Sequence, residues 1–223
     1  MSKIARIRFK KHVTKTEIIY AALRRAIRKG DLRPNQSLNT ARLAKQFSVS
    51  INPVREALRT LQETGLIKYT PHKGYAVHEP SVSEIKDIFL IFSALWCLAA
   101  GLAFTNINER VVQSLEGLLT KAKNSIVKGD LDSYSNIALQ FHNVILKCAH
   151  SKLLAETIDS FWERVLLMTR DRKTAKRLAK EDQEEHRRMI DLVRSGCKEE
   201  FVELMGKHEL DHGQVFVNSA KKR

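Results

Sequence analysis

Apolar residues recur every three to four positions along most of this chain of 223 residues, which is the spacing of helices with one buried face. After residue 80, one such stripe runs through Val111, Leu115, Leu118, Ala122 and Ile126. The pattern predicts helices at Ser83–Phe104, Glu109–Lys128, Asp132–His150, Lys152–Arg170, Thr174–Ser195 and Lys198–Asn218. No proline follows residue 80, and successive unbroken helices indicate an antiparallel all-α helical bundle.

The first 78 residues predict three helices followed by two short strands. The helices span Thr16–Lys29, Asn39–Phe47 and about Ser50–Thr64, and Pro53 fits the first turn of the third. Residues 31–38 read as a loop or a short edge strand. Short β-like runs at Leu66–Tyr69 and Tyr75–His78 flank a turn at Thr70–Gly74. The predicted fold class is therefore mainly α, with an N-terminal winged helix-turn-helix domain before the helical bundle.

The positive charge is concentrated in the N-terminal part of the chain. Residues 1–78 carry 17 Lys and Arg against 4 Asp and Glu, whereas residues 79–223 carry 22 against 21. This division predicts two domains, 1–78 and 79–223, and assigns the net charge of +14 to the first. A small basic domain built on paired helices suits double-stranded DNA as the partner. The first twelve residues form a basic arm without the apolar core of a signal peptide.

One uncharged segment, Ile88–Asn108, is long enough to cross a membrane as a helix. Polar residues occur from Thr105 onward, and a helix at the centre of a helical domain can also be apolar on all sides. We therefore expect a core or dimer-interface helix, no membrane partner and a cytoplasmic protein. A membrane-tethered DNA-binding protein is the alternative. Three widely spaced cysteines in apolar helical positions are typical of reduced thiols in the cytosol.

The helix that begins near Ser50 is the expected reading helix, because its apolar residues share one face and leave Asn52 and Arg55 on the other. An α-helix fits the major groove, where Arg pairs with guanine and Asn with adenine, so these two residues are the candidates for base recognition. The candidate DNA-binding residues are Arg42, Lys45, Ser50, Asn52, Arg55, Arg59, His72, Lys73 and Gly74. The basic members other than Arg55 are expected to meet phosphates, and Gly74 allows close backbone approach.

The N-terminal domain resembles the DNA-binding domain of the GntR family of bacterial transcription regulators in the run LNTARLAKQFSVSINPVREALRTLQETGLIKYTPHKGYAV. The helical remainder resembles the effector-binding FCD domain of the FadR-type branch. The resemblance implies a homodimer on a short palindromic operator, with a small-molecule effector in the C-terminal domain altering DNA affinity. Ala41 and Ile51 stand where the family usually has DNA-contacting arginines, and Asn52 replaces a usual threonine. We therefore expect an operator that differs from the common family sequence.

Three histidines, His142, His186 and His208, fall on the apolar faces of three different predicted helices. Imidazoles that converge in a bundle can hold a divalent cation such as Zn²⁺, although each alone is more often a core histidine. The FCD resemblance implies a metal, because its metal-binding members place histidine at these positions. Those members also use an Asp one turn before the first histidine, where this chain has Ala138. We expect up to one divalent metal per chain, with a fourth ligand from water, the effector or another side chain.

The candidate effector-binding residues are Phe92, Trp96, Ala138 and Arg164. In the FCD domains that the chain resembles, an inward Arg and, one turn later, a Glu occupy the positions of Phe92 and Trp96. The cavity is therefore expected to be more apolar and less suited to anions. The expected effector has apolar surface or a carboxylate met by the metal, and Arg164 and Arg170 are candidate partners for a carboxylate.

The sequence has no Gly-rich phosphate loop, no GxSxG and no HExxH, so we do not expect an enzyme. A three-histidine hydrolase is an alternative, since a zinc-bound water can become nucleophilic near neutral pH. Asp182, one turn before His186, is the nearest candidate for its general base. An architectural DNA-binding protein without an effector is a further alternative.

Overall fold

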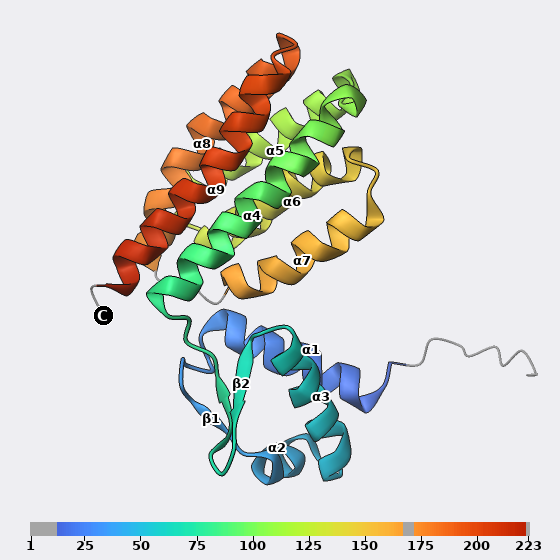
Figure 1. Cartoon of the computed structure of the whole chain (residues 1–223), viewed down its shortest axis with the longest axis vertical. Helices are drawn as coiled ribbons and strands as arrows, with labels where there is room; N and C mark the ends of the chain where they lie inside the picture. The colour runs from blue at the N-terminus through green and yellow to red at the C-terminus, as the bar shows by residue number, and fades with distance from the viewer. Residues whose placement is uncertain (1–12, 167–171, 222–223) are drawn as a thin grey trace, which may run out of the picture. The chain divides into compact units, whose positions relative to one another are not determined.

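A computed structural model describes residues 13–166 and 172–221 (Figure 1). The chain divides into two compact units, Met1–Glu79 and Pro80–Arg223. The first is a winged helix-turn-helix and the second is built from helices, which confirms the predicted mainly α fold class. The basic arm at residues 1–12 and the predicted helical residues 167–170 lie outside the described residues.

The N-terminal unit has three helices and a small three-stranded sheet. The helices are α1 (Lys15–Lys29), α2 (Thr40–Phe47) and α3 (Ile51–Glu63), and the strands are β1 (Ser37–Leu38), β2 (Ile67–Thr70) and β3 (Gly74–Val77). The sheet order is β1-β3-β2, and both pairings are antiparallel, with Leu38 opposite Tyr75 and Ile67 opposite Val77. The segment predicted as a loop or edge strand thus supplies the edge strand β1.

Local signals set the positions of the two helices of the helix-turn-helix. The Asn39 side chain accepts the Arg42 backbone N–H at 2.8 Å and starts α2. Ser48 ends α2 in the left-handed region, with φ of 53°, and turns the chain toward α3. The inward face of α3, including Val54 and Leu58, is fully buried, and α3 packs on α1 and α2. This packing leaves the opposite face of α3 exposed.

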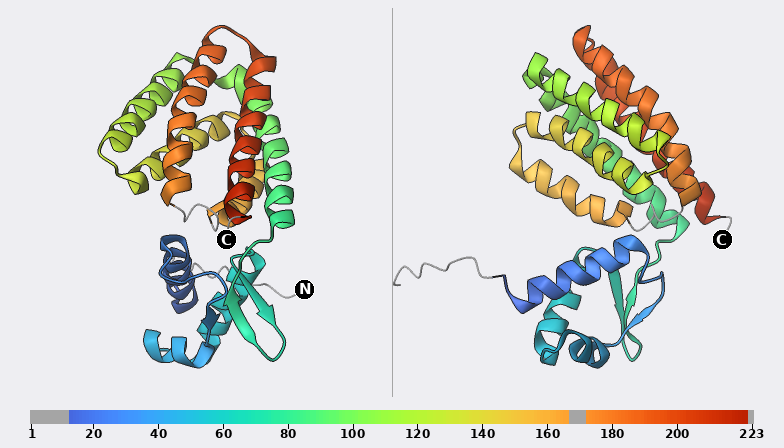
Figure 2. Two further views of the ribbon diagram at one scale, coloured as in Figure 1. Left: turned by 90° about the vertical axis from the view of Figure 1, so that its left-hand side faces the viewer. Right: turned by 180° about the vertical axis from the view of Figure 1, so that it is seen from behind.

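The C-terminal unit is a bundle whose described helices are α4 (Val82–Ala103), α5 (Glu109–Val127), α6 (Leu131–Cys148), α7 (Lys152–Leu166), α8 (Arg172–Arg194) and α9 (Lys198–Ala220). A short 3-10 turn, Phe104–Asn106, follows α4. Figure 2 shows α4 beside α9, and α8 on the other side of α9, in agreement with their contacts. The predicted helix bounds lie within a few residues of these ranges, apart from the end of α7 near the undescribed residues.

Two glycines bring α9 close to α4. A Cβ atom on Gly213 would lie 2.6 Å from the Cβ of Phe89, and one on Gly206 would lie 2.4 Å from the Sγ of Cys97. At the same crossing, the Ser93 hydroxyl donates to the carbonyl of Gly206 at 2.8 Å. The absence of side chains at positions 206 and 213 therefore permits this helix pair to pack as closely as it does.

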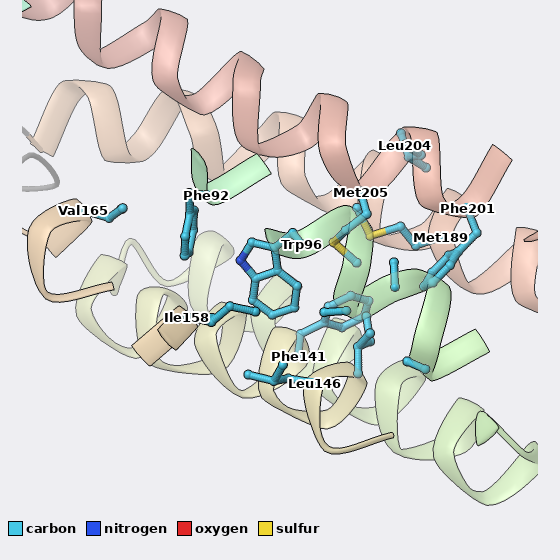
Figure 3. Close-up of a cluster of buried hydrophobic side chains, with 14 of the residues drawn as sticks. Phe92, Trp96, Phe141, Leu146, Ile158, Val165, Met189, Phe201, Leu204 and Met205 are labelled. Atoms are coloured by element: carbon cyan, nitrogen blue, oxygen red, sulfur yellow. The ribbon is translucent and has the colours of Figure 1, made fainter. Parts of the chain in front are cut away.

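The helix α4 supplies much of the core of the bundle. Its buried side chains include Phe89, Phe92 and Trp96, and Figure 3 shows Trp96 among side chains from other helices. By length and composition α4 could cross a membrane, but a core helix meets the same criterion. The other face exposes Leu90 and Leu98. The burial of one face supports the prediction that this segment is a core helix. It does not account for the leucines on the exposed face.

Four residues join β3 to α4. The His78 N–H donates to the Leu66 carbonyl at 3.0 Å. Pro80 has a restricted φ angle. The Ser81 hydroxyl accepts the Glu84 N–H, while the Glu84 carboxylate accepts the Ser81 N–H, so Ser81 belongs to the cap of α4. The connection between the two units is therefore short and contains several constrained positions.

Candidate functional site

The exposed face of α3 carries three of the predicted DNA-binding side chains. Asn52, Arg55 and Arg59 are exposed and spaced three and four residues apart, which places them on one side of the helix. Arg59 also forms an ion pair with Glu63 at 3.3 Å, and both side chains are exposed. Ser50 is the N-cap of α3 and makes no side-chain cap hydrogen bond. A helix N-terminus of this kind can donate backbone N–H groups to a phosphate.

The remaining predicted DNA-binding residues lie on α2 and in the wing. Arg42 and Lys45 are exposed on α2. In the β2–β3 turn, His72 and Lys73 are exposed, and the Lys73 N–H donates to the Thr70 carbonyl at 3.1 Å. His72 and Gly74 both have positive φ angles, 63° and 79°, so the turn holds a tight conformation that glycine adopts readily.

The two departures from the family pattern are also at the surface. Ala41 is exposed on α2, and Ile51 is 41% exposed at the start of α3. Neither side chain can donate a hydrogen bond to a phosphate or a base. The exposed face of the helix-turn-helix therefore offers fewer charged donors than the resemblance implies.

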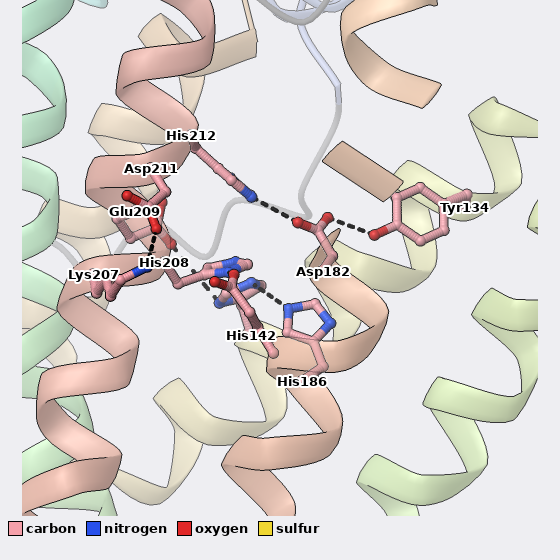
Figure 4. A network of polar contacts seen from close by, with 10 residues as sticks. Tyr134, His142, Asp182, His186, Lys207, His208, Glu209, Asp211 and His212 are labelled. Carbon is pink, nitrogen blue, oxygen red and sulfur yellow. Dashed lines mark hydrogen bonds and ion pairs between the residues drawn. The ribbon is translucent and has the colours of Figure 1, made fainter. Parts of the chain in front are cut away.

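The structure brings His142 of α6, His186 of α8 and His208 of α9 together in the buried interior (Figure 4). Each offers a ligand atom within 4.8 Å of the others. The Nε2 atoms of His142 and His186 lie 3.2 Å apart. Three imidazole nitrogens at these separations form a candidate metal centre.

Carboxylates lie on the outer side of this cluster. The Nδ1 atom of His208 lies 2.6 Å from the Oε2 atom of Glu185, so that nitrogen carries a proton and donates it to the carboxylate. The Nε2 atom is buried and has no hydrogen-bond partner among the described residues. On another side, the Oε1 atom of Glu209 lies 4.0 Å from the Nδ1 atom of His142.

A second cluster adjoins the first through His208. Asp182, His208 and His212 also have ligand atoms within 4.8 Å of one another. Asp182 accepts a hydrogen bond from the Tyr134 hydroxyl and pairs with the Nε2 atom of His212 at 2.7 Å, and Figure 4 shows this row of contacts. Asp182, the candidate general base of the hydrolase alternative, is therefore engaged by His212 and Tyr134.

The sequence interpretation did not select Tyr134, Glu185, Glu209 or His212. A signal for two of them was present, because His212 lies four residues after His208 and Glu185 lies immediately before His186. Residues four apart share a helix face, so His212 could have been added to the cluster from spacing alone. The pairing of Tyr134 with Asp182 joins two helices, and spacing within one helix does not predict it.

Burial controls the protonation of His142 and His186 and shifts the pKa values of two neighbouring groups. Burial lowers the pKa of His142 well below its ordinary value and lowers the pKa of His186 to about 3. Burial by itself would lower the pKa of His212, but the facing Asp182 raises it to about 9. Burial raises the pKa of Glu209. At neutral pH, His142 and His186 are therefore neutral imidazoles, the form that binds metals.

The metal-free protein is expected to lose stability as the pH falls from about 6.5 to about 5. The unfolded chain protonates His186 in this range, whereas the folded pKa of about 3 keeps the buried ring neutral. This difference favours unfolding by about 1.4 kcal/mol per pH unit, and His142 acts with the same sign. The raised pKa values of Glu209 and His212 act with the opposite sign, so the comparison with His186→Gln isolates the contribution of the histidine. Urea unfolding with a chelator at about pH 7 and about pH 5 measures the loss. His186→Gln should reduce it, and an unchanged loss would contradict this assignment.

Aromatic side chains also lie close to the His142 ring. The Trp96 and Trp162 rings lie with centroids 5.0 and 6.2 Å from that of His142, and Phe92 contacts both indoles. The buried indole N–H groups of both tryptophans have no hydrogen-bond partner among the described residues. Phe161 stacks on Phe92 at 6.4 Å. These four side chains form an aromatic wall beside the cluster. The wall is apolar apart from the two indole N–H donors.

The other predicted effector residues do not lie in this wall. Ala138 is half-buried one turn before His142 and packs near Tyr134 and Ala179, so it provides no metal ligand. Arg164 is exposed, with its guanidinium 5.9 Å from the centre of the Phe161 ring. Arg170 lies outside the described residues.

The donor set fits a divalent cation of the zinc type. Its members are buried, two are neutral at physiological pH, and His208 holds a buried Nε2 atom without a partner in the described parts of the chain. A metal-binding histidine usually donates its other ring N–H to a carboxylate, and the Nδ1 atom of His208 has such a contact with Glu185.

Comparisons with known proteins place both units. The model of bacterial regulatory proteins of the gntR family matches residues 15–77, and the FCD domain model matches residues 87–211. The HTH-type transcriptional regulator McbR of Escherichia coli K12 is 30% identical over 155 residues, 70% of each chain. YdhC of Bacillus subtilis, named as an uncharacterized HTH-type regulator, is 26% identical over 212 residues, 91% of this chain and 92% of its own.

A solved structure of E. coli McbR/YncC has the same fold. It superposes with a TM-score of 0.75, covers 93% of this chain and 99% of its own, and is 22% identical. At 22% identity, this structural similarity is evidence only for the arrangement of helices and strands.

Proposed function

Because the chain belongs to the GntR family of bacterial regulatory proteins and carries an FCD domain, it is a transcription regulator, and we propose that it works as an effector-responsive homodimer on a palindromic operator. In this proposal residues 1–78 bind DNA, and residues 79–223 bind the effector and dimerise. The main support for this proposal is the buried histidine cluster, which lies beside aromatic side chains. The same chain has a basic unit that exposes Asn52 and Arg55 on one helix face.

DNA contacts are proposed for the exposed residues of α2, α3 and the wing. Asn52 and Arg55 would meet base edges in the major groove, and Ser50 and Arg59 would meet phosphates beside them. Arg42 and Lys45 on α2, with His72, Lys73 and Gly74 in the wing, would add backbone contacts. Arg59 would have to release Glu63 to reach DNA, and this exposed ion pair costs little to break.

The effector site is proposed at the histidine cluster. His142, His186 and His208 would hold one divalent cation such as Zn²⁺, and Ala138 would leave a ligand position open to water or the effector. A bound cation supplies a positive charge that can meet a carboxylate. Phe92 and Trp96 would contact the apolar part of the molecule, so we propose a small carboxylate with apolar surface as the effector class. The exposed Arg164 could meet only a part of the effector that reaches the surface.

The exposed apolar face of α4 supports the proposed homodimer. Leu90, Ile91, Leu98 and Leu102 are exposed on it, and their spacing makes a stripe along the helix. Water contact along such a stripe is unfavourable, and a second copy of the chain could cover it. A dimeric cytoplasmic protein would be recovered in the supernatant after cell fractionation. Recovery of the full-length chain only in membranes would contradict this part of the proposal.

The proposed function can be tested by selecting DNA fragments that bind the purified protein. The selection is carried out with and without zinc and a panel of small carboxylates. We expect a palindromic consensus whose recovery changes with one of the carboxylates. Affinities for the selected operator and for random duplex should then be compared at increasing salt. A specificity ratio near one would remove the operator proposal, and recovery independent of all ligands would remove the proposed effector response.

His186→Gln is expected to abolish zinc binding at the cluster, because it removes one of the three imidazoles while keeping a side chain of similar size. Elemental analysis after growth with zinc should find up to one ion per chain in the parent protein and little in the variant. His150→Asn is the matched control, since His150 is exposed and has a positive φ angle that Asn tolerates. Equal zinc in the parent and in His186→Gln would contradict the site.

A further inference from the structure

Glu209 is the most unusual charged residue near the histidine cluster. It is 1% exposed, and neither carboxylate oxygen has a hydrogen-bond partner among the described residues. A buried carboxylate without partners is costly, so native proteins rarely keep one unless another interaction compensates for it. The residue that could compensate for the carboxylate is His142. Its Nδ1 atom lies 4.0 Å from the Oε1 atom of Glu209 and has no hydrogen-bond partner among the described residues.

The orientation of the His142 ring determines which of its two nitrogen atoms faces Glu209. Its Nε2 atom faces His186 at 3.2 Å, inside the cluster, while Nδ1 faces Glu209. A proton on Nδ1 that points toward the carboxylate leaves the lone pair of Nε2 for a cation. His208 already has this arrangement, with Nδ1 bonded to Glu185 and Nε2 unpartnered. Two of the three histidines thus have a carboxylate behind them.

A divalent cation at the three histidines would carry two positive charges, and Glu185 beside His208 offsets one of them. Three neutral imidazoles contribute no negative charge, and a divalent cation in a buried site needs compensation. Position 138 provides none, because it is alanine. Asp182 is less suitable, since its two oxygens are engaged by Tyr134 and His212. Glu209 is the buried carboxylate of this region whose oxygens are unengaged within the described structure.

We propose that Glu209 is a positioning residue of the metal site, which supplies the negative charge that alanine at position 138 does not and orients His142 through its Nδ1–H group. The inference rests on the proposed metal centre and adds an outer carboxylate to its three imidazoles. A shift of about an ångström would convert the separation of 4.0 Å into a charge-assisted hydrogen bond.

The test compares Glu209→Gln with the parent chain in zinc affinity, measured by competition with a chromogenic chelator. We expect roughly 10- to 100-fold weaker binding, the usual effect of removing an outer partner of a metal-binding histidine. Glu203→Gln is the matched control, because Glu203 is exposed on the same helix and should bind zinc as the parent does. In a Glu209→Gln background, Ala138→Asp should restore most of the affinity, because it places a carboxylate one turn before His142.

Thermal unfolding with and without zinc gives a second readout. A purely structural role of Glu209 would not change the gain in melting temperature that zinc produces. Without zinc, Glu209→Gln should melt at a higher temperature than the parent, because it removes a buried carboxyl group whose oxygens have no hydrogen-bond partner among the described residues. With zinc, its gain in melting temperature should be smaller. If the parent binds zinc and Glu209→Gln binds it equally well, the role of Glu209 is overturned while the metal site stands. If the parent takes up no zinc, the metal site is overturned together with this role.

Discussion

Alanine in place of Gly213 is expected to destabilise the C-terminal unit by about 1–3 kcal/mol, despite the better helix propensity of alanine. The new Cβ atom would lie 2.6 and 2.7 Å from the Cβ and Cγ atoms of Phe89, much closer than real contacts allow. Phe89 is buried and stacks on Phe216 with ring centroids 5.6 Å apart, so it has little room to move. Relief requires α9 to shift away from α4, which loosens the packing between these two helices.

Urea unfolding of the parent and of Gly213→Ala measures this loss. The matched control is Gly117→Ala in α5, where the glycine is exposed and a Cβ would meet no atom within 4 Å. That variant should be more stable than the parent by up to about 1 kcal/mol, from helix propensity alone. One chemical change is therefore expected to act with opposite signs at two helical positions. Equal shifts at both would contradict the close packing of α4 on α9.

Alanine in place of Arg55 is expected to weaken operator binding by about 1–3 kcal/mol and to relax the preference at one base position. Arg55 is exposed in the middle of the outer face of α3, where a helix in the major groove presents side chains to base edges. Binding should be measured on the selected operator and on single-base variants of it. The loss should disappear on the variant that changes the base read by Arg55.

Lys73→Ala is the contrasting variant, because Lys73 lies in the wing turn and is expected to meet a phosphate. It should weaken binding to all sequences about equally and reduce the salt dependence by about one counterion. The two variants together separate base recognition from backbone binding. The reverse pattern, with Lys73→Ala changing base preference and Arg55→Ala acting uniformly, would contradict both assignments.

Much of the fold could be predicted because its signals are local. Apolar spacing, Gly65 after α3 and Pro53 in the first turn of α3 indicate helices and their ends without knowledge of neighbours. The convergence of His142, His186 and His208 was also accessible, since each lies on the apolar face of its helix and those faces meet in the core.

The outer parts of the site could not be predicted in the same way. Glu209 follows His208 directly, and a charged residue next to an inward histidine is normally expected at the surface. Its burial depends on how α9 crosses α4 at Gly206 and Gly213, which is a property of the helix pair. Trp162 was missed for a similar reason, because its contact with His142 depends on the placement of α7 against α6.

The four-residue connection after β3 is held by local constraints at most of its positions. Its first residue is bonded to the Leu66 carbonyl, Pro80 restricts one torsion and Ser81 is part of the cap of α4, so few backbone bonds can rotate freely. The helix that carries Trp96 beside His142 starts immediately afterwards. The four residues between β3 and α4 therefore have few backbone torsions that can change without breaking a hydrogen bond or the cap of α4.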